Sequence, residues 1–171
     1  MIVREERPED REPSIEIERL AFEGPVEPAI VERVRDLDGS FALVAEDAGE
    51  VVGHVQFSRA WVGELPVVAV GPIGVRPERQ RQGIGSALIV AGLEEARCRG
   101  EPAVILLGSP AFYGSRGFVP GSTFGLRNPF AGVMEDGFAI DEADFQVAVL
   151  ADPAPGLAGE VRWDPAFDEA G

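Results

Sequence analysis

The segment Val75–Leu88 reads VRPERQRQGIGSAL, and it separates two contrasting patterns. Residues 67–75 are β-branched and almost continuously apolar, as in a buried strand, whereas apolar residues recur at helical spacing from Leu88 onward. Gly83 and Gly85 have no Cβ, so a ligand can approach the backbone closely there. The first amides of a helix have no intrahelical partner and lie at the positive end of its dipole. The segment therefore predicts a strand, an anion-binding loop and a helix.

Two motifs give this loop a more specific interpretation. The spacing Gln80-x-x-Gly83-x-Gly85 differs from the common nucleotide loops, because no Gly-x-x-x-x-Gly-Lys run occurs and a dinucleotide loop would need glycine at Leu88. The second motif, Phe112-Tyr113-Gly114-Ser115-Arg116-Gly117-Phe118, follows the apolar run 103–107. Together the motifs resemble the GNAT superfamily of N-acetyltransferases, in which the first binds the acyl-CoA pyrophosphate and the second follows the fifth strand. The resemblance is greatest to a branch of predicted N-acetyltransferases whose strand ends in Leu-Gly-x-Pro, as Leu107-Gly108-Ser109-Pro110 does here.

The resemblance implies an α/β (α+β) fold, in which a mixed central β-sheet with splayed fourth and fifth strands is flanked by helices. It covers roughly residues 2–120. A chain of 171 residues with 45% hydrophobic residues suits one domain. We expect a single N-acetyltransferase domain over 1–171, with its core at 2–120 and a C-terminal loop and strand extension at 121–171.

The patterns along the chain place the remaining elements. Pro72, Gly71 and Gly74 interrupt the predicted fourth strand where the family splays, although a simple bulge without a ligand is the alternative. We expect residues 119–140 to be mainly loop and 164–171 to be frayed. The other elements expected are a short strand at 2–4, helices at about 10–22 and 27–37, a hairpin of 41–46 with 51–61, and strands at 103–107, 145–150 and 159–163.

The composition limits the partners. The net charge is −15, and all fifteen cations are arginines. An acidic surface repels phosphate backbones and anionic lipid, so we expect neither nucleic acid nor a membrane as partner. One cysteine and one histidine exclude an intrachain disulfide and a zinc cluster, so we expect no metal. With a charged N-terminus and no long apolar run, we expect a cytoplasmic protein.

The resemblance implies acetyl-CoA as co-substrate, a small-molecule or peptide amine as acceptor, and direct transfer between them; a homodimer is left open. A backbone N–H of the fourth strand would hold the thioester oxygen, with Ile73, Gly74 and Val75 as candidates. Tyr113, the only tyrosine, would protonate the leaving thiolate. The residues expected to bind CoA are Gln80, Arg81, Gln82, Gly83, Ile84, Gly85 and Ser86, besides the three strand residues.

The general base is left open. His54, Gln56 and Ser58 alternate along one strand, so their side chains share a face. His54 is either a hydrogen-bonded structural histidine or a catalytic base or substrate contact. Many relatives carry a glutamate in the fourth strand, which has none here, and Glu46, Glu64 and His54 are the nearby candidates. The competing functions are a non-catalytic acyl-CoA-binding or sensing module and an interaction domain that no longer binds CoA.

Overall fold

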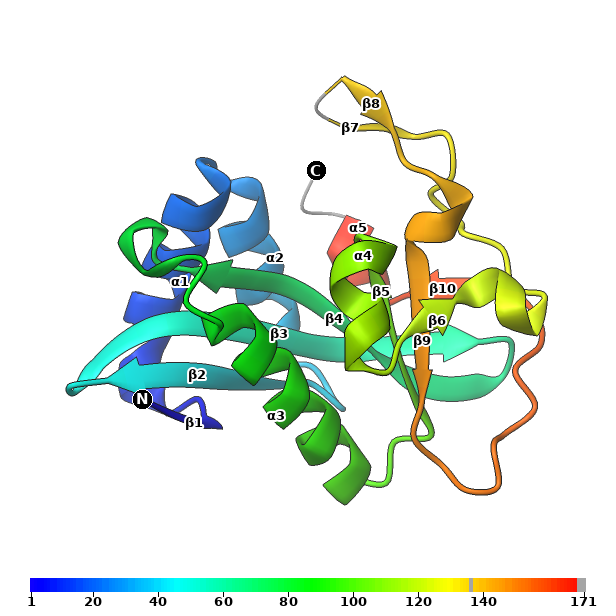
Figure 1. Cartoon of the computed structure of the whole chain (residues 1–171), viewed down its shortest axis with the longest axis horizontal. Coiled ribbons are helices and arrows are strands. Elements are labelled where there is room, and N and C mark those ends of the chain that lie inside the picture. Colours follow the sequence, from blue (N-terminus) through cyan, green and yellow to red (C-terminus); the bar gives the residue numbers. More distant parts are fainter. Residues whose placement is uncertain (136, 169–171) are drawn as a thin grey trace.

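The computed structural model describes residues 1–135 and 137–168, which fold around one mixed sheet flanked by helices (Figure 1). The strand order is β1-β2-β3-β4-β5-β9-β6, with β10 paired to β3. The strands are β1 Ile2–Glu5, β2 Phe41–Asp47, β3 Glu50–Val62, β4 Leu65–Val75, β5 Ala103–Leu107, β6 Val119–Pro120, β7 Met134–Glu135, β8 Phe138–Ala139, β9 Phe145–Val149 and β10 Val161–Trp163. The helices are α1 Arg11–Phe22, α2 Val26–Val34, α3 Ile84–Cys98, α4 Pro110–Tyr113 and α5 Pro165–Asp168. Short 3-10 turns occupy Pro8–Asp10, Pro77–Arg79, Gly114–Arg116, Gly121–Phe124 and Glu142–Asp144.

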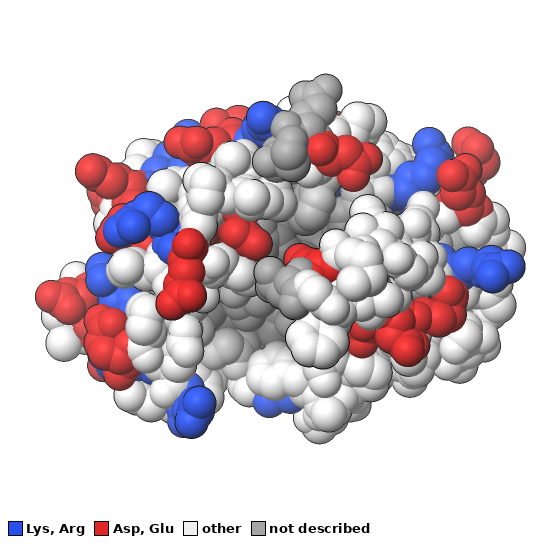
Figure 2. All heavy atoms as spheres, turned by 90° about the horizontal axis from the view of Figure 1, so that it is seen from above, with Lys and Arg blue, Asp and Glu red and all other residues white. Residues whose placement is uncertain are grey.

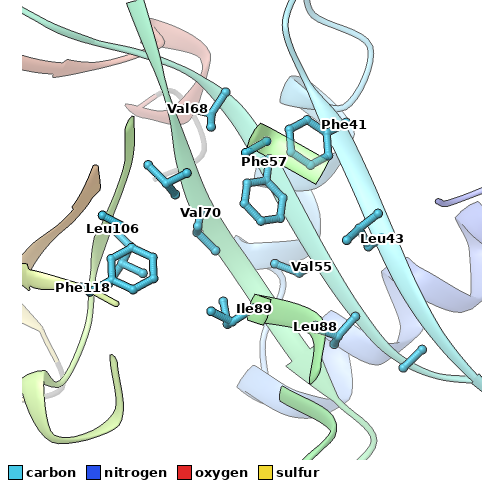
Figure 3. Close-up of a cluster of buried hydrophobic side chains, with 14 of the residues drawn as sticks. Phe41, Leu43, Val55, Phe57, Val68, Val70, Leu88, Ile89, Leu106 and Phe118 are labelled. Carbon is cyan, nitrogen blue, oxygen red and sulfur yellow. The ribbon is translucent and has the colours of Figure 1, made fainter. Parts of the chain in front are cut away.

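The main core lies between the sheet and α3. Phe57 stacks on Phe41 with ring centroids 4.4 Å apart, and Leu88 and Ile89 of α3 are buried in the same cluster (Figure 3). The close approach depends on glycine, because a Cβ at Gly92 would collide with the Phe57 ring. Tight packing of α3 on the sheet therefore fixes where the preceding loop lies.

The predicted splay of the fourth and fifth strands is confirmed. β4 and β5 are parallel and pair only at Val68 with Val104 and at Ala69 with Ile105. β4 nevertheless continues to Val75 while it stays paired with β3. The edge of β4 that faces away from β3 is consequently open from Val70 onward.

The C-terminal region is more ordered than the sequence indicates. β9 inserts between β5 and β6, and β10 pairs with β3. The segment expected to be mainly loop also contains the small β7–β8 hairpin, visible at the top of Figure 1. The expectation of fraying is wrong for α5, because Phe167 packs against the cluster that contains Trp163; the rest of that expectation, at 169–171, lies outside the described residues. In the described part of the chain, no helix has the length and apolar character that crossing a membrane requires.

Candidate active site

The predicted anion-binding loop has an open start to its helix. Gly83 precedes α3 with φ of 82°, in the left-handed region that favours glycine. The amide of Ala87 donates to the Gly83 carbonyl at 3.0 Å, so the amides of residues 84–86 precede the first closing bond of the helix. A Cβ at Gly83 or Gly85 would meet no atom within 4 Å. The loop therefore presents free donors to open space.

The space in front of the loop is a cavity of about 430 Å³ with basic side chains in its wall. Arg79 is committed to the protein, since it donates to Asp47 at 2.7 Å and to Gln82 at 3.2 Å. Arg81 is exposed, and no carboxylate of the described residues lies within 4 Å of its guanidinium. Arg81 is thus the cation in this wall that a bound anion could recruit. The cavity is lined by Val75, Arg79, Gln80, Arg81, Gly83, Ile84, Gly85, Ser86 and Phe112.

Arg116 is a site residue to which the sequence analysis gave no role. Its guanidinium carbon lies 3.7 Å from the centroid of the Phe112 ring, and Nε donates to the Ser86 hydroxyl at 3.1 Å. The second motif is therefore docked on the first turn of α3. Arg116 adds a second cation beside the loop amides. In the sequence, only its position inside the second motif could have indicated this role.

The open edge of β4 offers backbone amides to a ligand. The Arg76 amide donates to the Val52 carbonyl of β3 at 3.0 Å. Because successive amides of a strand alternate in direction, the Gly74 amide also faces β3, opposite His54. The amides of Ile73 and Val75 then face the open edge. The three oxyanion candidates are thereby reduced to Ile73 and Val75.

Tyr113 lies across the opening from these amides. Its half-buried ring packs edge-to-face against Phe112 and Phe118, with centroid distances of 4.8 and 5.6 Å. Tyr113, Ile73 and Val75 line one cavity of about 240 Å³. Burial raises the pKa of the Tyr113 phenol above its ordinary value of 10. The phenol is therefore protonated at neutral pH, as a proton donor must be.

His54 is fully buried, so its side chain reaches neither cavity surface directly. Its Nδ1 lies 2.6 Å from Oε1 of Glu18, a buried carboxyl of α1, and its Nε2 lies 3.7 Å from Oε1 of Glu6. Glu6 in turn lies 3.4 Å from Arg35. Burial raises the pKa of Glu18 well above its ordinary value and lowers the pKa of His54 to about 4. Burial therefore favours the uncharged form of both groups, which lie within hydrogen-bond distance of each other.

Glu18 links this pair to the open edge, and the sequence analysis missed it. A Cβ on Gly74 would lie 2.8 Å from Oε2 of Glu18, so the carboxyl occupies the space that any larger residue would need. Gly74 lies between the two oxyanion candidates. The other candidate bases lie elsewhere: Glu46 pairs with Arg4 at 2.7 Å, and Glu64 is exposed in the turn between β3 and β4.

Comparison with known proteins identifies the class to which this fold and site belong. The Acetyltransferase (GNAT) family profile matches residues 11–118, and the chain belongs to this family. It is 34% identical to the uncharacterized N-acetyltransferase YhbS of Escherichia coli, over 98% of this chain and 99% of that protein. The crystal structure of E. coli YhbS in complex with CoA matches 98% of this chain and 91% of that chain, with a TM-score of 0.84. A GNAT acetyltransferase from Brucella melitensis in complex with acetyl-CoA matches at 28% identity, 98% and 97% coverage and a TM-score of 0.74.

Proposed function

We propose that this protein is an N-acetyltransferase that moves an acetyl group from acetyl-CoA directly to a primary amine. The observation that carries the proposal is the shared cavity of Tyr113 and the amides of Ile73 and Val75. This cavity continues into the one in front of the loop, since both are lined by Val75, Gln80, Gly85 and Phe112. The cavities therefore bring together backbone amides that can donate hydrogen bonds to a developing oxyanion, a proton donor and an anion site.

The residues of this path suit acetyl-CoA. The amides of residues 84–86, with Arg81 and Arg116, would hold the pyrophosphate, because free amides at a helix start bind phosphate oxygens. The amide edge of β4 would pair with the pantetheine amides. When bound, acetyl-CoA supplies an activated acetyl thioester. The similar E. coli and Brucella structures contain CoA and acetyl-CoA, respectively, which supports this assignment.

The proposed catalytic roles belong to groups that line the cavity beside Tyr113. The Ile73 or Val75 amide stabilises the negative charge that develops on the carbonyl oxygen as the neutral amine attacks. Tyr113 donates its proton to the departing thiolate and regains one from solvent, while the amine loses one proton to solvent. Protons therefore balance. His54 acts as a positioning residue, because its bond to Glu18 holds the carboxyl against Gly74, between the two oxyanion candidates.

The acceptor is a small-molecule or peptide amine in this proposal. The charge of −15 supports the expectation that nucleic acid and anionic membrane are not partners. Cytoplasmic location remains a prediction, and a homodimer stays open.

The test compares the amounts of the two reaction products. Acetyl-CoA is incubated with a panel of amines, and free thiol and N-acetylated amine are measured in the same sample. Equal amounts of both, formed only with protein present, support direct transfer. Thermal stabilisation by CoA without any transfer would instead identify the non-catalytic acyl-CoA-binding module.

A further inference from the structure

The open edge of β4 has opposite charges at its two ends. The loop cavity at one end has Arg79 and Arg81 in its wall. A separate cavity of about 220 Å³ lies at the other end, where β4 passes Gly71 and Pro72. The only charged residues that line this second cavity among the described ones are Glu27 of α2 and Glu135 of β7. The open edge of β4 therefore runs from a basic cavity to an acidic one.

The acidic cavity borders the reaction region. Phe22 lines both this cavity and the one that contains Tyr113. Apolar side chains from α2, β10 and α5 complete the wall, namely Ile30, Trp163 and Phe167. Figure 2 shows the molecule hollowed across the face seen from above, with acidic side chains near the rim of the hollow. A molecule in this cavity would thus contact both apolar walls and carboxylates.

Within the described part of the chain, the two carboxylates lack a cationic partner. Over residues 1–135 and 137–168, no arginine nitrogen lies within 4 Å of Glu27 or Glu135, whereas Glu101 has Arg59 at 2.8 Å. Glu27 is half-buried, so its charge is less screened than that of an exposed residue. Its field reaches the centre of the site, because it adds to the effect of burial in raising the pKa of Glu18. The cavity is consequently suited to a cation.

The cation held there differs from the reacting nitrogen. A carboxylate beside an ammonium favours the charged form, whereas the nucleophile must be neutral to attack. Taking the proposed acetyl transfer as given, we infer that the acceptor carries two cationic groups joined by an apolar segment, and that Glu27, assisted by Glu135, binds the group that does not react. The apolar segment lies along Phe22, Trp163 and Phe167, and the second amine reaches the thioester beside Tyr113.

The experiment compares hexylamine with hexamethylenediamine, which has the same carbon chain and one more cation. Binding is measured by calorimetry on the protein saturated with CoA, and turnover by thiol release with acetyl-CoA. The variants are Glu27→Gln and Glu135→Gln, with Glu32→Gln as the control because Glu32 is exposed on the same helix as Glu27 and loses the same charge. We expect the diamine to bind about tenfold more tightly than the monoamine, and Glu27→Gln to remove most of this difference. Glu135→Gln should have a smaller effect, and Glu32→Gln none.

The outcomes separate this inference from the proposed function. Equal affinity for both amines, or equal loss in Glu27→Gln and Glu32→Gln, would overturn the inference while transfer to hexylamine would still support the function. Diamine binding that depends on Glu27 without any transfer would support the acceptor site and contradict the function. Failure of both amines to bind or react, with CoA still bound, would contradict both the inference and the proposed function.

Discussion

The Nδ1 atom of His54 lies 2.6 Å from Oε1 of Glu18, and both side chains are shielded completely from solvent. Glu18 also occupies the space beside Gly74 that a side chain would need. This pair therefore connects a helix and two strands at the point where the β4 edge opens.

The first prediction concerns stability against pH. Because burial raises the pKa of Glu18, its contribution is present at low pH and is lost as the pH rises above 4.5 through the raised pKa. Burial lowers the pKa of His54 from 6.5 to about 4, so its contribution is present above pH 6.5 and is lost as the pH falls to about 4. Glu18→Gln should flatten the alkaline limb of a Tm–pH curve, and His54→Gln the acidic limb. Curves parallel to wild type would refute the assigned pKa directions.

The second prediction concerns turnover in His54→Gln. Losing the bond that holds Glu18 against Gly74 should lower kcat about tenfold, since small displacements of catalytic groups are costly. The Kd of CoA, measured by calorimetry, should stay at the wild-type value because the loop is unchanged. Ser58→Ala is the matched control: Ser58 is buried on the same strand but lies opposite Ala69, away from Gly74. If Ser58→Ala loses as much turnover as His54→Gln, the loss is due to general destabilisation and the positioning role of His54 is wrong.

The third prediction uses Gly85. A Cβ there meets no protein atom within 4 Å, so Gly85→Ala should leave Tm unchanged without ligand. The added methyl projects into the space assigned to the pyrophosphate, so the Kd of CoA should rise about tenfold through loss of amide contacts. Gly156→Ala, which also adds a methyl group in open space, should change neither value. Normal CoA binding by Gly85→Ala would place the anion site elsewhere.

The fourth prediction concerns Arg81. Its removal in Arg81→Ala should weaken CoA binding about fivefold at low ionic strength, and the difference from wild type should shrink as salt is added, because salt screens exposed charges. Arg97→Ala removes the same charge at the far end of α3, where Arg97 pairs with Glu94. The affinities are compared over a salt series. If the two variants lose the same affinity for CoA at each salt concentration, the effect comes from net charge and Arg81 has no specific role in the site.

Local patterns were sufficient to predict the fold around the loop. Three features depend only on neighbouring residues: the β-branched run before the loop, the two glycines and the helical spacing after it. β5 likewise has the predicted limits at Ala103 and Leu107. Prediction failed where the chain depends on distant contacts. The stretch 164–171 is acidic enough to suggest fraying, yet Phe167 packs on a cluster formed by other strands.

The candidate site shows the same division. Tyr113 and the loop lie in motifs, so spacing identified them as candidates. Glu18 lies in α1 among other acidic residues, and only tertiary packing distinguishes it by burying its carboxyl beside His54. The alternation of amide directions along β4 required the register with β3, which sequence alone does not fix.

The most direct test of the account is the turnover of Tyr113→Phe, measured beside its affinity for CoA. The substitution keeps the ring and its contacts with Phe112 and Phe118, and it removes only the hydroxyl. General acid catalysis typically contributes about 10²- to 10⁴-fold in rate. The account predicts a loss of kcat in this range with the Kd of CoA unchanged, and a smaller loss when the thioester has a better leaving group. Full turnover, or a loss explained entirely by weaker CoA binding, would contradict it.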